Sequence, residues 1–281
     1  MSTVAIIGAG DLGGAVAQAL AARERVARIV LVDTAADVAA GKALDIQQSG
    51  AVAAGSHASL ASTDDLSRAA GAAACVIADR ASGMEWDGEE GLAMLRRLVP
   101  YVSGSPLVFA GARQAELMLH ASHEARITAS RLVGSAPEAF ASALRAIVAL
   151  EAHCSPKEIM LAVLGAPGTF VVPWSEASIG GYALEHVLSQ VQITRIEGRA
   201  ARLWPPGPYT LGAAAARATE AVVTSGRERL SVLTLLGGEF GVRNRIGAVP
   251  VLLNRHGIAD VRVPTLNTRE RVLIETSLDG L

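Results

Sequence analysis

The stretch Gly8-Ala9-Gly10-Asp11-Leu12-Gly13 decides the fold, because it joins an apolar run to an alanine-rich run. Glycines at this spacing, after a strand and at the start of a helix, are typical of the turn that holds the phosphates of a dinucleotide. Gly8 permits a tight turn, Gly10 lets the backbone approach a pyrophosphate, and Gly13 allows close packing of helix on strand. The helix N-terminus then offers free N–H groups and a partial positive charge to the phosphates.

An acidic residue completes this pattern. Asp33 lies twenty residues after Gly13, at the end of the next apolar run. It would accept hydrogen bonds from the adenosine ribose and repel a 2′-phosphate, which favours NAD over NADP. The alternative is a glycine-rich turn that binds nothing, with Asp33 capping the next helix. The residues expected to hold the cofactor are Gly8, Gly10, Asp11, Leu12, Gly13, Asp33, Ala78 and Gly111.

The first half of the chain alternates short apolar runs with helix-like stretches. Continuous apolar strands are typical of a parallel sheet covered on both faces, so the pattern predicts a doubly wound α/β fold. The predicted strands are residues 4–7, 29–32, 74–78, 107–110 and 131–133. The predicted helices are residues 12–25, 36–47, 91–102, 117–129 and 137–150.

The regular alternation of apolar runs and helix-like stretches ends after Leu150, and we expect a domain boundary there. Residues 1–150 would form the dinucleotide-binding domain and residues 151–281 a second α/β domain. Asn267 or Thr268 would cap the last helix. In this half the predictions are strands at 159–164 and 190–196, helices at 211–225 and 267–278, and a hairpin within 231–253.

Composition excludes several classes of protein. The 281 residues are 51% hydrophobic and 19% charged, with a formal net charge of −2. We therefore expect neither a disordered chain nor one that binds nucleic acid through bulk charge. The apolar residues are spread out, so neither a membrane span nor a signal peptide is expected. Cys75 and Cys154 suit neither a disulfide framework nor a metal cage, which favours the cytoplasm.

The order of landmarks along nearly the whole chain resembles the lactate/malate dehydrogenase family. The glycine turn and Asp33 are followed by G-x-x-x-D at residues 41–45. A stretch ending in V-P-x-W-S matches residues 165–175, and a late G-E-F-G hairpin begins at residue 238. Residues 247–258 and 264–270 resemble the family's last landmarks. The resemblance implies a Rossmann-type sheet followed by a substrate domain, NAD as cofactor, and a homodimer or homotetramer.

The same resemblance implies a catalytic set that this sequence does not carry. The family uses a His base oriented by an Asp, with an Arg that clamps the substrate carboxylate. By register, Pro167 stands at the His position, Phe140 at the Asp position and Ala143 at the Arg position. The mobile loop, residues 81–95, has acidic residues in place of arginines, and residues 111–114 replace the family's N-P-V-D motif.

Weak substitutes for the lost groups are Glu138, Arg145 and Arg80, and His153 is a further base to consider. Each also has an ordinary structural interpretation, such as Glu138 in the first turn of a helix. Three hypotheses follow: a catalytically silent homologue that senses a dinucleotide or acts as a scaffold, a divergent oxidoreductase with an altered substrate, and an ordinary malate or lactate dehydrogenase. The missing groups favour the first two.

Overall fold

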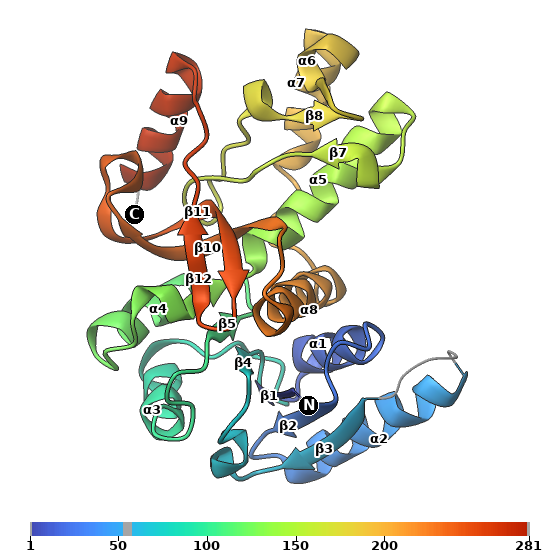
Figure 1. Cartoon of the computed structure of the whole chain (residues 1–281), viewed down its shortest axis with the longest axis vertical. Coiled ribbons are helices and arrows are strands. Elements are labelled where there is room, and N and C mark those ends of the chain that lie inside the picture. The colour runs from blue at the N-terminus through green and yellow to red at the C-terminus, as the bar shows by residue number, and fades with distance from the viewer. Residues whose placement is uncertain (1, 53–57, 280–281) are drawn as a thin grey trace.

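The computed structural model describes residues 2–52 and 58–279. Its lower lobe holds a twisted sheet between helices, and a smaller upper lobe stands on it (Figure 1). The parallel strands are β1 (Thr3–Ile7), β2 (Arg28–Val32), β3 (Ser59–Thr63), β4 (Ala74–Ile77), β5 (Leu107–Phe109) and β6 (Leu132–Gly134). The helices of this half are α1 (Asp11–Ala21), α2 (Ala36–Val52), α3 (Gly88–Leu98), α4 (Ala115–His123) and α5 (Ala136–Ala152).

The first six strands lie in the order β3-β2-β1-β4-β5-β6, and each neighbouring pair is parallel. This is the strand order of a Rossmann fold, in which the order reverses between β1 and β4. Successive side chains of the strands point to opposite faces of the sheet and pack in two apolar clusters. One cluster lies between the sheet and helices α1 and α2, and the other lies between the sheet and helices α3 and α4. The predicted doubly wound sheet, covered on both faces, is confirmed.

The second half completes the sheet and builds the upper lobe. Strands β10 (Arg229–Gly237), β11 (Arg243–Asn254) and β12 (Gly257–Val261) join the sheet edge at β6. The predicted hairpin is the antiparallel pair β10–β11. Strands β7 (Ile159–Met160), β8 (Ser178–Ile179) and β9 (Tyr182–Ala183) form a separate small sheet. The helices are α6 (Leu184–Val187), α7 (Gln190–Ala200), α8 (Pro208–Thr224) and α9 (Thr268–Asp279).

Two sequence predictions of this half are wrong. The strand expected at 159–164 ends at Met160, because the Val163 N–H donates to the Ser231 side chain and Leu164 forms an isolated bridge with Val171. Residues 190–196 form the start of helix α7 and not a strand. Ser189 and Gln192 make a capping box, and the buried side chains Ile193, Ile196 and Ala200 recur at helical spacing. The β-branched residues suggested a strand, but the cap and this buried face determine the structure.

The two halves of the sequence are packed together. Helix α8 lies against α1, and a Cβ on Gly212 would be only 2.7 Å from the Cβ of Ala15. Four alanines of α8 are buried within the single chain: Ala214, Ala215, Ala216 and Ala218. The sheet and this helix pair therefore both cross the expected boundary near Leu150, which itself stays a prediction.

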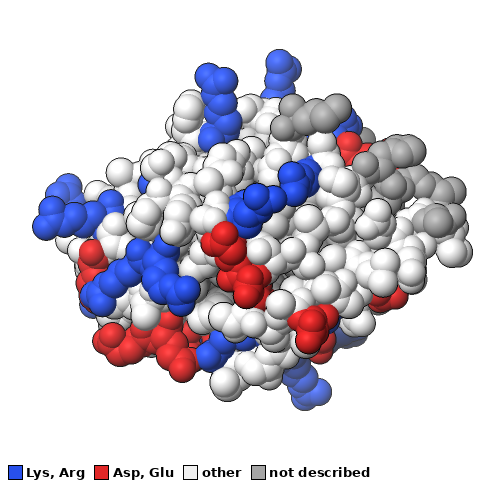
Figure 2. Space-filling view, turned by 90° about the horizontal axis from the view of Figure 1, so that it is seen from below, with Lys and Arg blue, Asp and Glu red and all other residues white. Residues whose placement is uncertain are grey.

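The surface shows mixed charge. Seen from below, basic and acidic side chains gather in small groups beside a largely uncharged area (Figure 2). Among the described residues, helices long and apolar enough to cross a membrane are absent.

Candidate functional site

The glycine turn lies at the carboxyl end of β1, beside the end of β4, where the strand order reverses. Gly8 has φ of +110°, and a Cβ there would be 2.1 Å from the carbonyl oxygen of Asp79. A Cβ on Gly13 would be 2.1 Å from the carbonyl oxygen of Gly8. Both residues must therefore be glycine for the strand, the helix and the segment after β4 to pack this closely.

The N-terminus of α1 binds a carboxylate from its own chain. Asp79 Oδ1 accepts a hydrogen bond from the Gly13 N–H at 2.9 Å, and Oδ2 accepts one from the Leu12 N–H at 3.2 Å. The Asp79 carbonyl accepts from the Gly10 N–H at 3.0 Å. Asp79 is only 5% exposed. The sequence predicts that the N–H groups of Gly10, Leu12 and Gly13 bind a pyrophosphate. Asp79 is not among the site residues expected from the sequence.

Asp33 lies beside the glycine turn, as its position in the sequence predicts, but its carboxylate is already bonded. Oδ2 accepts from the N–H groups of Ala9 at 2.8 Å and Ala81 at 2.9 Å, and Oδ1 accepts from Ala35 at 2.9 Å. Asp33 therefore ties together the glycine turn, the start of α2 and the segment after β4. Ribose recognition by this carboxylate stays a prediction.

A third carboxylate covers the turn before α4. Glu85 accepts from the N–H groups of Ala112 at 3.1 Å and Arg113 at 2.9 Å. The Gln114 side chain accepts from the Gly111 N–H and donates to the carbonyl of Ala78. Ala78 and Gly111 are thus buried near the turn, where the sequence analysis placed them, and their backbone groups are paired within the chain.

The segment between β4 and α3 is folded onto the crevice. Asp79 and Glu85 form an antiparallel bridge, and the Arg80 N–H donates to the Met84 carbonyl at 2.9 Å. The Arg80 guanidinium pairs with Glu90 and lies 5.2 Å from the centre of the Trp86 ring. These contacts give Arg80 a structural role. At the rim, Asp11 is exposed and pairs with Lys42 at 3.2 Å.

A dinucleotide does not fit the crevice in this conformation. Its phosphates would need the N–H groups of residues 10, 12 and 13, all of which donate to Asp79. A buried carboxylate would also repel them. The sequence does contain a signal for this arrangement: an acidic residue directly after the strand that borders the glycine turn.

The positions that the resemblance assigns to the catalytic Asp and His lie near an aromatic cluster. The Phe140 ring is 5.5 Å from that of Phe170 and 6.5 Å from that of Trp204, centre to centre. Phe170 and Trp204 meet edge to face at 4.8 Å. Pro167 lies in the turn of residues 165–171, and Ala143 lies on α5, one turn after Phe140. The cluster is apolar at a place where the family resemblance implies an ionisable pair.

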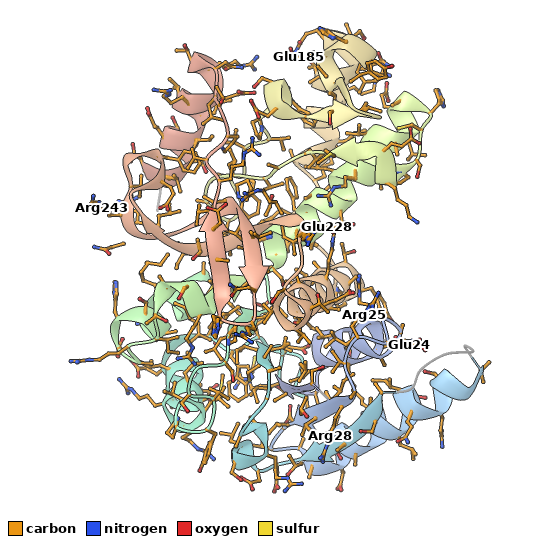
Figure 3. All side chains as sticks on the ribbon, in the orientation of Figure 1. Glu24, Arg25, Arg28, Glu185, Glu228 and Arg243 are labelled. Atoms are coloured by element: carbon orange, nitrogen blue, oxygen red, sulfur yellow. The ribbon has the colours of Figure 1, made fainter. Side chains whose placement is uncertain are left out.

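Glu138 and Arg145, the other two weak substitutes, pair with each other. Glu138, buried at 1% exposure, accepts from Arg145 at 2.8 Å, from Arg217 at 2.9 Å and from the Ser231 N–H at 3.2 Å. Arg217 also pairs with Glu228 at 2.7 Å (Figure 3 labels Glu228). The hydrogen bond from Arg217 lowers the pKa of the Glu228 carboxyl. This network joins α5, α8 and β10. His153 ends α5 in the left-handed region, on the surface.

The upper lobe contains a half-open cavity of about 580 Å³ beside the aromatic cluster. The rings of Phe140, Phe170, Trp174 and Trp204 line it, and Figure 3 shows Glu185 at the far end of this lobe. Glu197 accepts from the Trp174 indole at 3.0 Å, and Glu270 is bonded to Ser175 and Asn267. The charged side chains in the lining are Glu185, Glu197, Glu270 and Arg269.

Metal chemistry has no support in the part of the chain that the structure describes. Within residues 2–52 and 58–279, clusters of three or more His, Cys, Asp or Glu side chains that could hold a metal ion are absent.

The fold and the crevice define a class: a chain built like the two-lobed dehydrogenases, with a Rossmann-type sheet and a substrate lobe. The chain is 30% identical to the malate dehydrogenase of Cytophaga hutchinsonii, over 98% of this chain and 94% of that protein. It is 31% identical to the malate dehydrogenase of Thioalkalivibrio sulfidiphilus, over 100% and 97%. The chain therefore belongs to the malate/lactate dehydrogenase family, which confirms the resemblance inferred from the landmarks.

Solved structures agree with this fold. Malate dehydrogenase from Salinibacter ruber superposes with a TM-score of 0.86 at 24% identity, covering 98% of this chain and 93% of that one. A lactate dehydrogenase from Cryptosporidium parvum, solved with lactic acid and NAD, gives a TM-score of 0.87 at 19% identity, covering 99% and 95%. A scan against family models found no match.

Proposed function

We propose that this chain is a non-catalytic member of its family, a dinucleotide-sensing or scaffolding homologue that does not oxidise malate or lactate. The observation that carries the proposal is the aromatic cluster of Phe140, Phe170 and Trp204. Oxidation of a 2-hydroxy acid needs a base for the hydroxyl proton and a cation for the carboxylate. The resemblance puts Phe140, Pro167 and Ala143 at those positions, and none of the three has an ionisable side chain.

The candidate substitutes support the same proposal. Glu138 is held by two arginines and a backbone N–H, so a proton acceptor there is already satisfied. Arg145 and Arg80 are engaged with carboxylates of the chain. Rebuilding the site from these three groups would require breaking ion pairs, one of which is buried.

A turnover assay tests this proposal. The purified chain is mixed with NAD and either L-malate or L-lactate, and the absorbance of reduced nicotinamide is followed. The malate dehydrogenase of Cytophaga hutchinsonii serves as the active control. We expect no turnover above background from this chain. Turnover comparable to the control enzyme would overturn the proposal and the assignment of Phe140 and Pro167.

The cofactor to test first is NAD, because the negative charge of Asp33 disfavours the 2′-phosphate of NADP. The relatives are named malate dehydrogenases, and one structural neighbour holds NAD. Thermal stabilisation by NADH and by NADPH is measured side by side, in the wild type and in Asp79→Ala, and any stabilisation should be larger with NADH. A larger shift with NADPH would contradict the preference.

The second candidate function is a divergent oxidoreductase with an altered substrate, and the cavity favours it. Four aromatic rings, three glutamates and one arginine line the cavity, which suits a neutral or cationic ligand better than a dicarboxylate. A thermal-shift screen of neutral alcohols, amino alcohols and 2-hydroxy acids would test this. A stabilising compound whose effect is lost in Glu185→Gln and that reduces NAD would favour this function over the first.

We also propose that the chain is a cytoplasmic homo-oligomer, a dimer or a tetramer. Large apolar side chains are exposed on several elements, and such surface is often covered by a partner. The size in solution, measured by light scattering, would contradict this if it corresponds to a monomer at all concentrations. The exposed apolar residues include Leu150, Met160, Tyr182, Val191 and Tyr209.

A further inference from the structure

We infer that Asp79 is an internal ligand of the glycine turn, whose carboxylate takes the place of a dinucleotide phosphate and closes the crevice to NAD. Within the proposed function, this inference favours scaffolding over dinucleotide sensing. It concerns the cofactor half of the site and does not depend on the loss of the catalytic pair.

The backbone donors of the turn carry the first part of the argument. The N–H groups of Gly10, Leu12 and Gly13 all donate to Asp79. The Ala9 N–H donates to Asp33. A phosphate bound at the start of a helix depends on such donors. A dinucleotide must therefore displace Asp79 before its phosphates can form the hydrogen bonds that the glycine pattern predicts.

The space beside Gly10 carries the second part. A Cβ on Gly10 would be 2.3 Å from the Asp79 carboxyl carbon and 2.4 Å from the Arg80 carbonyl oxygen. In the sequence, Gly10 predicts room for a pyrophosphate. In the structure, that room holds the Asp79 side chain, so the missing Cβ serves a contact within the chain.

The third observation is that hydrogen bonds hold the segment after β4 in place. Asp79 lies two residues after β4, which is buried in the sheet, and forms a bridge with Glu85. Glu85 is itself bound to the turn before α4, and the Ala81 N–H is bound to Asp33. Asp79 thus belongs to a segment fixed to three neighbouring turns, and its 5% exposure fits that arrangement.

The negative charges of the buried carboxylates also oppose binding of a dinucleotide in the crevice. Asp33 and Asp79 are both buried, and each carboxylate accepts a hydrogen bond from the glycine turn, Asp33 from Ala9 and Asp79 from Gly13. A pyrophosphate brought to the same donors would meet two negative charges at short range in a region from which water is largely excluded. Binding of NAD in this conformation is therefore opposed by both occupancy and charge.

The inference is tested by titrating NADH, followed by its fluorescence, into the full chain and three variants. Asp79→Ala frees the N–H groups of Leu12 and Gly13, and Asp79→Asn keeps the shape but removes the charge. Glu89→Gln, at an exposed acid in the first turn of α3, is the matched control. We expect no saturation of the wild type or the control at about 1 mM NADH, and binding at least about tenfold tighter in Asp79→Ala. Saturable micromolar binding by the wild type, unchanged or weakened in Asp79→Ala, would overturn the inference.

A second measurement needs no variant. Amide hydrogen exchange of the ligand-free wild type should show Leu12 and Gly13 protected, because both donate to Asp79. Rapid exchange at both residues would overturn the inference even if Asp79→Ala does not fold. Inorganic pyrophosphate is a further probe, expected to stabilise Asp79→Ala against heat but not the wild type. Because none of these readouts is turnover, their failure would leave the non-catalytic proposal standing.

Discussion

The crevice of the lower lobe and the cavity of the upper lobe differ in how they are filled. The crevice has the glycine pattern of a dinucleotide site, but Asp33, Asp79 and Glu85 already use its backbone donors. The cavity of about 580 Å³ is open, and aromatic rings line it beside charged side chains such as Glu197 and Arg269. Carboxylates of the chain itself thus fill the crevice, whereas the cavity has a mixed aromatic and charged lining.

This difference shows that a sequence motif can be kept although the ligand site that it usually forms is occupied by the chain itself. A glycine pattern reports backbone geometry, and that geometry is preserved whether the N–H groups face a phosphate or a carboxylate. Catalytic groups are single side chains, so under the proposed function Phe140 and Pro167 take their positions without disturbing the fold. The sequence therefore carries the glycine pattern of a cofactor site, although in the structure the N–H groups of this turn donate to Asp79.

The largest effect is expected from Asp33→Ala. Three N–H groups in the crevice would lose their acceptor, so we expect the free energy of unfolding to fall by about 4 kcal/mol. Urea unfolding measures this, with the exposed Asp37→Ala as control and a change within about 0.5 kcal/mol expected there. A loss as small as the control's would show that Asp33 is free, as a residue awaiting ribose would be.

Phe140→Ala tests the other half. Removing a ring that is 6% exposed and contacts two others should cost about 3 kcal/mol in unfolding free energy. Leu150→Ala, on the same helix but 67% exposed, should cost less than about 0.5 kcal/mol. Equal effects for the two variants would show that the cluster does not stabilise the upper lobe.

Glu85→Gln has a smaller expected effect, because the amide can still accept one of the two hydrogen bonds. We expect a loss of about 1 kcal/mol in unfolding free energy, since a charge-assisted bond becomes a neutral one. Faster amide exchange at Ala112 and Arg113 should accompany it. Glu89→Gln is the control, and indistinguishable exchange in the two variants would contradict the anchoring of this segment.

The smallest effect concerns the two thiols. Burial raises the pKa of Cys75, in β4 beneath the crevice, to about 12. A raised pKa means that the reactive thiolate is scarce until the pH approaches that value, so Cys75 should resist a thiol reagent at about pH 8. Cys154 is partly exposed and should react. Labelling of both thiols in the native protein would contradict a closed lower lobe.

Most of the fold was predictable because it depends on sequence patterns that extend over a whole strand, helix or turn. Apolar runs such as residues 29–32, and the glycine turn that follows β1, predict the parallel strands of a doubly wound sheet. Short or two-residue elements, such as β7 and β9, have no pattern of their own and depend on tertiary contacts. Residues 190–196 show the limit, because β-branched residues on a capped, amphipathic helix resemble a strand.

The site was only partly predictable for a related reason. The positions of Asp33, Ala78 and Gly111 around the turn follow from where the parallel strands end. What the carboxylates bind could not be predicted, because it depends on how residues 79–90 fold back across the sheet edge. Asp79 is 66 residues from Gly13, its partner.

Parallel calorimetric titrations of the wild type and Asp79→Ala with NADH test whether Asp79 stands in for the dinucleotide phosphate. We expect no measurable heat of binding for the wild type and a saturable isotherm for the variant. A saturable wild-type isotherm that disappears in Asp79→Ala would contradict this expectation, because Asp79 would then support the cofactor and not replace it.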